Sequence, residues 1–330
     1  MKKAIYLFSD GDLRRKDNTI YFENENGWKR IPVENTNGLY AFGEVDVNKR
    51  FLEFVTRSKI IIHFFNCYDY YIGSYYPREY ISSGYMILRQ AEHHLDYERR
   101  IEIARYFVKG ASQNMLQVIR YYINRGKELV EVENAIRELT CLLDNYYTIE
   151  ELMAIEGNIR EYYYRAFDII LDNPDFVFEQ RTKRPPKNYL NTLISFDNSM
   201  IYTVVLSEIY RMHLDPRIGY LHATNFRRYT LNLDIAELFK PIIVDRIIFT
   251  VVRKNMITKE DFEKSAQGIL LTDKGKMLFI RQFEDKLKTT IKHRESGRNI
   301  SYRRLIRMEL YKFEKYLIGE LEYSPYVASW

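Results

Sequence analysis

The pattern of hydrophobic and polar positions divides the chain into two parts with different periodicities. Up to about residue 80, short apolar runs are separated by turn residues such as Asp10-Gly11 and Asn37-Gly38, which is typical of β-strands. The expected strands span 4–8, 12–15, 18–23, 28–32, 39–42, 59–65 and 70–76. One helix is expected among them, over 47–56, because its large apolar residues recur at helical spacing.

Beyond Pro77 the pattern predicts long helices, and capping residues indicate where several of them begin. Thr148 and Thr258 are each followed three residues later by an acid, which is the spacing of a capping box. Asn188 follows two prolines, and Ser301 precedes the last long periodic segment. The expected fold class is therefore α+β, with a β domain over residues 1–80 and a larger all-α domain over residues 81–330.

Composition is that of a globular protein, since 46% of the 330 residues are hydrophobic and 29% are charged. No uncharged apolar run reaches the ~18 residues that a membrane helix needs. The basic start Met1-Lys2-Lys3 precedes a segment too short for a signal peptide, so we expect a cytoplasmic protein. Cys67 and Cys141 lack metal-ligand spacing, and buried free thiols are expected.

The distribution of charge is more informative than the formal net charge of +5. Residues 281–307 contain nine Lys and Arg against three acids. A second cluster has no acid between its members, which are Arg181, Lys183, Arg184 and Lys187. Either cluster is a solvated face or a set of contacts to phosphate groups.

Glu156 lies within an apolar helical stripe. The stripe consists of Leu152, Glu156, Ile159, Tyr163, Phe167 and Ile170. An unpaired carboxylate there would cost several kcal/mol, so it should meet a cation, a metal ion or a proton. Arg160, one turn later, offers a buried salt bridge as the alternative to a metal. Gly157 favours close approach by a ligand or another backbone, since a glycine inside a helix costs ~1 kcal/mol.

Two more acids, Asp234 and Glu237, lie one turn apart on a second predicted helix. Pro241 cannot donate the hydrogen bond that would reach the carbonyl of Glu237, so the helix should bend beside that acid. The alternative is that the acids simply favour a helix start, which suits Asp234 better than Glu237.

His222 follows an irregular segment between helices and precedes this acidic pair. A lone histidine is often a structural residue with a satisfied hydrogen bond. Together with two carboxylates, however, one imidazole would suit Mn²⁺ or Mg²⁺, whereas zinc usually takes more nitrogen or sulfur ligands.

Five short motifs occur in order along the chain, and together they carry a family resemblance. They are Ile155-Glu156-Gly157-Asn158, Arg184-Pro185-Pro186-Lys187, Asn191-Thr192-Leu193-Ile194-Ser195-Phe196, Gly219-Tyr220-Leu221-His222, and Leu233-Asp234-x-x-Glu237-x-x-x-Pro241-x-x-Val244-Asp245-Arg246. With these motifs the chain resembles the CRISPR-associated spacer-acquisition endonuclease, the universal integrase subunit of that immune system. It is most similar to the branch found with type I-B systems.

The resemblance implies a small N-terminal β-sandwich-like domain used for dimerisation, a larger helical catalytic domain, and a homodimer that assembles with a small ferredoxin-like Cas partner. It also implies a site for Mn²⁺ or Mg²⁺ formed by Glu156, His222 and Glu237, with Asp234 matching a nearby catalytic acid. Asp197 is a departure, because many relatives have glycine there.

The implied activity is that of a metal-dependent DNA endonuclease and integrase. In the family reaction, 3′-hydroxyl ends of a short DNA fragment are joined to the CRISPR repeat by transesterification. Expected phosphate contacts are the cluster from Arg181 to Lys187 together with Arg227 and Arg228. Two alternatives are an ordinary metal-dependent nuclease, which would only cut, and a catalytically silent DNA-binding scaffold, which would bind no metal.

Overall fold

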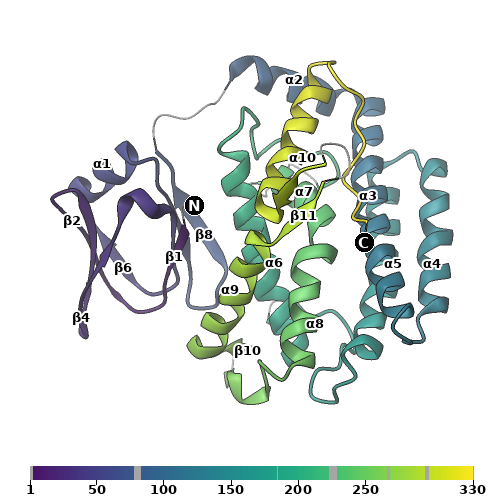
Figure 1. Ribbon diagram of the computed structural model, residues 1–330. Coiled ribbons are helices and arrows are strands. Elements are labelled where there is room, and N and C mark those ends of the chain that lie inside the picture. Colours follow the sequence, from purple (N-terminus) through teal and green to yellow (C-terminus); the bar gives the residue numbers. More distant parts are fainter. Residues whose placement is uncertain are drawn as a thin grey trace. The chain divides into compact units, whose positions relative to one another are not determined.

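The computed structural model describes residues 3–77, 83–183, 185–222, 229–265, 268–293 and 297–329. It separates into two compact units, Met1–Ile81 and Ser82–Trp330. The first unit is rich in strands and the second in helices (Figure 1), so the expected α+β fold class is confirmed.

The first unit contains two four-stranded sheets. In one sheet the neighbours are, in order, β1 (Lys3–Leu7), β5 (Thr36–Ala41), β7 (Ile61–Phe65) and β8 (Tyr71–Tyr75). In the other they are β4 (Gly27–Ile31), β3 (Thr19–Asn24), β2 (Gly11–Lys16) and β6 (Val45–Val47). The pairings β1–β5, β5–β7 and β2–β6 are parallel, and the others are antiparallel.

One hydrophobic core joins both sheets of this unit to its helix α1 (Lys49–Arg57). Leu13 and Ile20 come from one sheet, Leu39 and Ile62 from the other, and Phe51 from the helix. Successive side chains of a strand point to opposite faces of the sheet, so only every second residue of each strand points into this core. The arrangement is sandwich-like.

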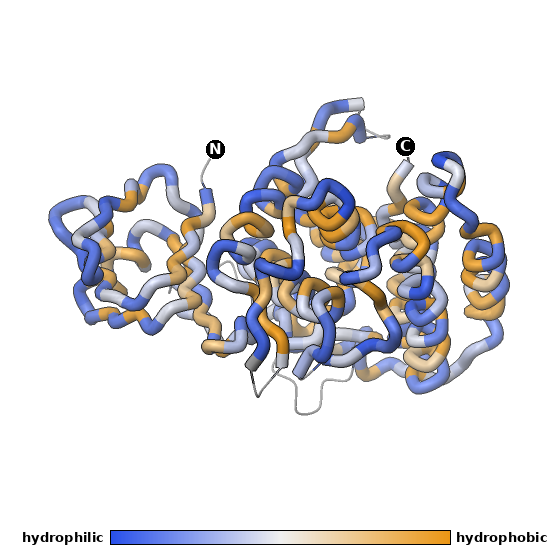
Figure 2. Tube along the Cα trace, turned by 90° about the horizontal axis from the view of Figure 1, so that it is seen from below, coloured by the Kyte–Doolittle hydropathy of each residue, from blue (hydrophilic) through white to orange (hydrophobic). Residues whose placement is uncertain are grey.

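The second unit is mainly helical. Its α-helices are α2 (Gly84–Leu95), α3 (Tyr97–Ile123), α4 (Val130–Cys141), α5 (Ile149–Leu171), α6 (Tyr189–Ile209), α7 (Leu231–Phe239), α8 (Arg246–Arg253), α9 (Asp273–Lys288) and α10 (Tyr302–Leu317). Figure 2 shows hydrophobic and hydrophilic stretches alternating along these helices, as expected for helices with one buried and one exposed side. Helix α6 differs, because its residues are buried on nearly every side.

The expectation of an all-α second domain needs a correction, because two short antiparallel hairpins interrupt the helices. They are β9 (Phe262–Ser265) with β10 (Gly268–Leu271), and β11 (Thr290–Lys292) with β12 (Asn299–Ser301). Thr258 does form the expected capping box with Asp261, but the box closes only a 3₁₀ turn, Lys259–Asp261. The residues after that turn pair as a strand, so a cap specifies a helix start without specifying its length.

The other helix starts predicted from caps are confirmed at Thr148, Asn188 and Ser301, whose side chains accept a backbone N–H from the first turn. Cys67 and Cys141 are free, as expected, but both are exposed, so the expectation of buried thiols was wrong. No helix in the described part of the chain is long and apolar enough to span a membrane.

Candidate functional site

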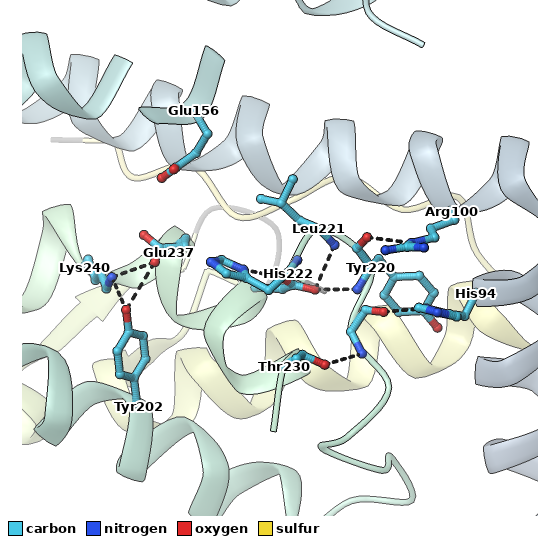
Figure 3. A network of polar contacts seen from close by, with 12 residues as sticks. His94, Arg100, Glu156, Tyr202, Tyr220, Leu221, His222, Thr230, Glu237 and Lys240 are labelled. Carbon is cyan, nitrogen blue, oxygen red and sulfur yellow. Dashed lines mark hydrogen bonds and ion pairs between the residues drawn. The ribbon is translucent and has the colours of Figure 1, made fainter. Parts of the chain in front are cut away.

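The candidate site is assembled from helices α5 and α7 and from the segment that ends at His222. Helix α5 begins at a complete capping box, in which the backbone N–H of Glu151 donates to Thr148 Oγ1 at 3.2 Å. Leu152, Ile159 and Phe167 are buried along one side of this helix, as the apolar stripe predicted. Glu156 is in the same stripe, and its side chain is 13% exposed. In Figure 3 its carboxylate points toward Glu237 and His222.

Arg160 bridges the two glutamates of the site. Its Nε and Nη2 donate to Glu156 Oε1 at 2.8 and 2.6 Å, and Nη2 also donates to Glu237 Oε2. The buried salt bridge expected as the alternative for Glu156 is therefore present. Glu156 Oε2 accepts no hydrogen bond from the described residues, so one oxygen of that carboxylate stays open.

Lys240 and Tyr202 hold the other side of Glu237. Lys240 Nζ donates to Glu237 Oε1 at 2.6 Å and also to the Tyr202 hydroxyl, which itself donates to Glu237 Oε1 at 3.4 Å. Figure 3 shows these three side chains as one network. Burial alone would raise the pKa of Glu237, but the charges of Arg160 and Lys240 outweigh it and hold that pKa well below its usual range.

Asp234 fixes both the backbone and the imidazole of His222. The Asp234 carboxylate is fully buried and accepts the backbone N–H groups of Tyr220, Leu221 and His222 at 2.6, 3.2 and 3.0 Å. The same carboxylate contacts His222 Nδ1 at 2.7 Å. Because Nδ1 is engaged there, Nε2 is the ring nitrogen that a ligand can reach, and no described residue bonds to it.

The segment that carries His222 depends on a close contact at Gly219. Its N–H donates to Thr230 Oγ1 at 2.9 Å, and a Cβ at position 219 would meet that same oxygen at 2.7 Å. His94 Nδ1 bonds to the Gly219 carbonyl, and Arg100 Nε donates to the Tyr220 carbonyl. A glycine is needed here because no side chain fits in the contact.

Pro241 ends α7 one turn after Glu237, as the sequence indicated. The chain continues as a π-helical turn, Pro241–Asp245, before α8 begins. The Lys240 carbonyl accepts the N–H groups of both Val244 and Asp245, which is how the backbone adjusts to the donor that proline lacks. Glu237 thus lies on the last turn of α7 and Lys240 directly after it, where Glu237 bonds to Arg160 and Lys240 bonds to Tyr202.

The structure brings Glu156, Glu237 and His222 into one neighbourhood, and they interact electrostatically. Burial acts to lower the pKa of His222, but the Asp234 hydrogen bond and the charges of Asp234, Glu237 and Glu156 raise it. Within the described part of the chain, no three His, Cys, Asp or Glu side chains lie close enough together to hold a metal ion. Arg160 lies between the two glutamates and bonds to both.

The donor set nevertheless fits a divalent metal. Two carboxylates and one imidazole suit Mn²⁺ or Mg²⁺, and Glu156 Oε2 and His222 Nε2 are available. The contact from Asp234 to His222 Nδ1 is the kind of support that metal-binding histidines usually have.

The residues expected to contact phosphate differ in their exposure and in their contacts within the fold. Arg181 is partly buried and donates to Asn191 Oδ1 and Ser195 Oγ, so its guanidinium is used within the fold. Lys183 and Lys187 are exposed, and Lys183 interacts electrostatically with Glu156. Three of the expected residues lie outside the described residues: Arg184, Arg227 and Arg228.

The basic region 281–307 is partly neutralised by acids of the same unit. Arg303 and Arg307 both pair with Glu208, which is fully buried on α6. Arg303 and Lys288 also pair with Glu284. These three cations pair within the fold, whereas Arg281, Lys292, Arg298 and Arg304 are exposed.

Asp197 lies on α6 with 1% exposure, and neither of its carboxylate oxygens bonds to a described residue. Burial raises its pKa well above the ordinary value, and the nearby carboxylate of Asp245 raises it further. Burial also raises the pKa of Asp245 to about 7. Burial and Asp245 thus favour the protonated form of the Asp197 carboxyl group, and the nearby Lys240 opposes them only in part.

Sequence reasoning did not identify Lys240 and Tyr202 as parts of the site. The three-residue spacing from Glu237 to Lys240 could have suggested an ion pair across one helical turn. Nothing in the sequence indicates Tyr202, since it reaches Glu237 from another helix, 35 residues earlier.

Comparison with known proteins relates the whole chain to one family. The family described as "CRISPR associated protein Cas1" matches residues 5–285. A protein of Thermodesulfovibrio yellowstonii named CRISPR-associated endonuclease Cas1 2 is 60% identical over 330 residues, which are 100% of both chains. CRISPR-associated endonuclease Cas1 of Thermotoga maritima is 50% identical over 318 residues, or 96% of this chain and 98% of that one.

Solved structures agree with this relation. A CAS1 protein from Thermotoga maritima superposes with a TM-score of 0.88 at 48% identity, covering 98% of this chain and 100% of that one. A casposase bound to an integration product has a TM-score of 0.85 at 16% identity, covering 98% and 93%. A Cas6-RT-Cas1–Cas2 complex has a TM-score of 0.84 at 16% identity over 99% of this chain and 36% of that one. At such low identity the last two show a shared fold.

Proposed function

Because the chain belongs to the Cas1 family of CRISPR-associated endonucleases, we propose that it is a metal-dependent DNA integrase whose site is formed by Glu156, His222 and Glu237. In the proposed reaction, a 3′-hydroxyl end of a short DNA fragment attacks a phosphodiester at the edge of the CRISPR repeat. The new phosphodiester forms as the old P–O bond breaks, so the reaction needs no covalent enzyme intermediate.

The observation that carries the proposal is the combination of an open imidazole nitrogen with two carboxylates from separate helices. Asp234 bonds to His222 Nδ1, which directs Nε2 toward Glu156 and Glu237 (Figure 3). Bound Mn²⁺ or Mg²⁺ would supply charge stabilisation for the attacked phosphate and lower the pKa of the attacking hydroxyl. The chain would hold the metal ligands in place, because α5 and α7, which carry Glu156 and Glu237, are packed into the fold through their buried residues.

The surroundings of Glu156 support DNA as the substrate. Gly157 is exposed, and a Cβ added there would meet no atom of the described residues within 4 Å, so these residues leave space next to Glu156. The close approach by another protein backbone, considered for this glycine, does not occur among the described residues. The exposed Lys183 interacts electrostatically with Glu156. A phosphodiester beside Glu156 would therefore meet open space and a cation.

We also propose that the chain works as a homodimer and with a small ferredoxin-like Cas protein. One structure of similar fold is a Cas6-RT-Cas1–Cas2 complex, which makes a Cas2-type partner reasonable. The β domain, with two sheets around one core, is the proposed dimerisation domain.

A strand-joining assay tests the proposed function. Glu156→Gln and Glu237→Gln keep a side chain of the same shape that can still accept from Arg160, but they remove the charge that binds a metal. We expect both variants, and His222→Asn, to lose detectable joining of a labelled fragment to a repeat substrate in Mn²⁺. Glu161→Gln is the matched control, since Glu161 lies on the exposed side of the same helix and should join DNA at the wild-type rate.

The products and the metal dependence separate the alternatives. An ordinary nuclease would yield only shorter fragments, and a DNA-binding scaffold would bind DNA without either product. Asp234→Asn should retain some joining at high Mn²⁺, because losing a residue that only orients a ligand typically costs ~10–100-fold. Joining at the wild-type rate by folded Glu237→Gln, with folding checked by circular dichroism, would remove Glu237 from the proposed ligands.

A further inference from the structure

Helix α5 carries two glutamate–arginine pairs with identical spacing and different surroundings. In Glu156–Arg160 and in Glu161–Arg165 the residues are four apart, and each Nη2–Oε1 distance is 2.6 Å. The Glu161–Arg165 side chains are both 60% exposed, whereas those of Arg160 and Glu156 are 14% and 13% exposed. Exposed pairs of this kind contribute little, so the two arginines should differ in function even though the sequence around them is alike.

Arg160 differs further because it contacts a second carboxylate. Its Nη2 reaches Glu237 Oε2 from another helix, while Nη1 is buried and has no hydrogen-bond partner among the described residues. An arginine guanidinium stays protonated in proteins, so Arg160 keeps its positive charge beside the two carboxylates that it bonds. A permanent positive charge therefore lies between two of the proposed metal ligands.

The charges around the site are nearly balanced before any metal binds. Three carboxylates, those of Glu156, Asp234 and Glu237, face two basic side chains, Arg160 and Lys240, and each basic side chain bonds directly to Glu237. A divalent cation gains less from carboxylates that are already paired with cations than from free ones. It would also be repelled by the Arg160 guanidinium, which bonds to the same two carboxylates.

We propose that Arg160 is a counter-cation that competes with the divalent metal for the carboxylates of Glu156 and Glu237 and thereby keeps metal binding weak. The inference rests on the proposed function, since it concerns the same site. Two consequences follow: Arg160 stabilises the metal-free protein by compensating two buried carboxylates, and it leaves the metal-loaded site with excess positive charge, which favours a phosphodiester.

Metal binding to the whole protein tests this directly. Arg160→Gln removes the positive charge and keeps a side chain that can donate hydrogen bonds. We expect its Mn²⁺ dissociation constant, measured by isothermal titration calorimetry, to fall at least about tenfold, because the repulsion is lost at short range in a partly buried site. We also expect its melting temperature without metal to fall, and Mn²⁺ to raise that temperature more than it does in the wild type.

Two further variants distinguish charge from geometry. Arg160→Lys keeps the charge but lacks the guanidinium fork, and its Mn²⁺ affinity should stay close to that of the wild type. Arg165→Gln removes the matched exposed arginine and should change neither Mn²⁺ affinity nor melting temperature. If Arg160→Gln is unfolded without metal, a Mn²⁺ titration followed by circular dichroism should refold it, and failure of Mn²⁺ to do so would contradict the proposal.

The outcomes separate this inference from the proposed function. If the wild type binds Mn²⁺ and joins DNA but Arg160→Gln binds Mn²⁺ equally or more weakly, Arg160 only positions the carboxylates and the inference fails alone. If wild-type protein binds no Mn²⁺ and joins no DNA, the proposed metal site fails as well. Tighter binding in Arg160→Gln together with wild-type affinity in Arg160→Lys would establish the competition.

Discussion

Asp197 presents the clearest residue-scale conflict between a side chain and its surroundings. Its carboxyl group is buried, lacks hydrogen-bond partners among the described residues, and lies near a second buried acid, Asp245. Lys240 favours the charged form of Asp197, but that amine already donates to Glu237 and Tyr202. The fold therefore favours the protonated form of Asp197 more than the unfolded chain does.

This conflict predicts a pH-dependent effect of Asp197→Asn. A carboxyl group whose folded pKa is raised costs stability once the pH exceeds the unfolded pKa of ~3.9, and the cost grows until the folded pKa is passed. Asp197→Asn removes that cost, so we expect it to raise the free energy of unfolding at pH 8, by an amount that shrinks as the pH falls. Near pH 4 the two proteins should be almost equally stable.

Chemical denaturation of the two proteins across this pH range is the measurement. Asp285→Asn is a suitable control, because Asp285 is exposed on α9 and its replacement should have a small effect at every pH. A pH-independent difference between wild type and Asp197→Asn would mean that Asp197 is ionised in the folded protein.

At the scale of the element, two helical glycines that look alike in the sequence have opposite roles. Gly157 on α5 is uncrowded, since an added Cβ would have no atom of the described part of the chain within 4 Å. Gly110 on α3 is in tight contact, because a Cβ there would lie 2.6 Å from Pro325 Cβ and 2.7 Å from Leu238 Cδ2. Helix α3 can approach α7 and the C-terminal segment closely only with glycine at this position.

We therefore predict opposite signs for alanine substitution at these positions. Gly157→Ala should raise the free energy of unfolding by about 0.5–1 kcal/mol, since alanine stabilises an exposed helix interior relative to glycine. Gly110→Ala should lower it, by about 1–3 kcal/mol, the usual cost of overpacking a core. Urea denaturation of both variants against the wild type measures this, and a destabilised Gly157→Ala would show that α5 is strained at that residue.

At the scale of the whole molecule, the net charge of +5 does not show that some basic residues pair with acids while others are exposed. Many Arg and Lys side chains of the second unit pair with acids inside the fold, such as Arg303 and Arg307 with Glu208. Lys183 and Lys187 are exposed on the segment that leads into α6. Binding to DNA should therefore depend on exposed cations such as these two.

The salt dependence of DNA binding measures this. Each lost phosphate contact reduces the slope of log K against log salt concentration by about 0.9 on duplex DNA. We expect Lys183→Ala with Lys187→Ala to flatten this slope in a fluorescence anisotropy titration, with little effect on melting temperature. Arg181→Ala should mainly lower the melting temperature, because Arg181 donates to Asn191 and Ser195. If the lysine double variant keeps the wild-type slope, these two residues do not contact phosphate and are only solvated surface charges.

Local features of the fold could be predicted from the sequence alone. Strand alternation, the caps at Thr148, Asn188 and Ser301, and the break at Pro241 each depend on residues within a few positions of one another. The apolar stripe of α5 also singled out Glu156 as a carboxylate that needed a cation. Such features are set by backbone geometry and helical or strand period, which the order of residues fixes directly.

The partners of those residues were decided only by tertiary structure. The pairing of Arg160 with Glu156 could be predicted from their spacing on one helix. The contact of Arg160 with Glu237 could not, because it joins residues 77 positions apart. Asp234 lies in the first turn of α7, as one interpretation had it, but its carboxylate holds the backbone and imidazole of His222. Tyr202 reaches Glu237 from α6. Local periodicity specifies which side of a helix is buried, whereas which side chains meet there depends on how separate helices pack, and that involves the whole core at once.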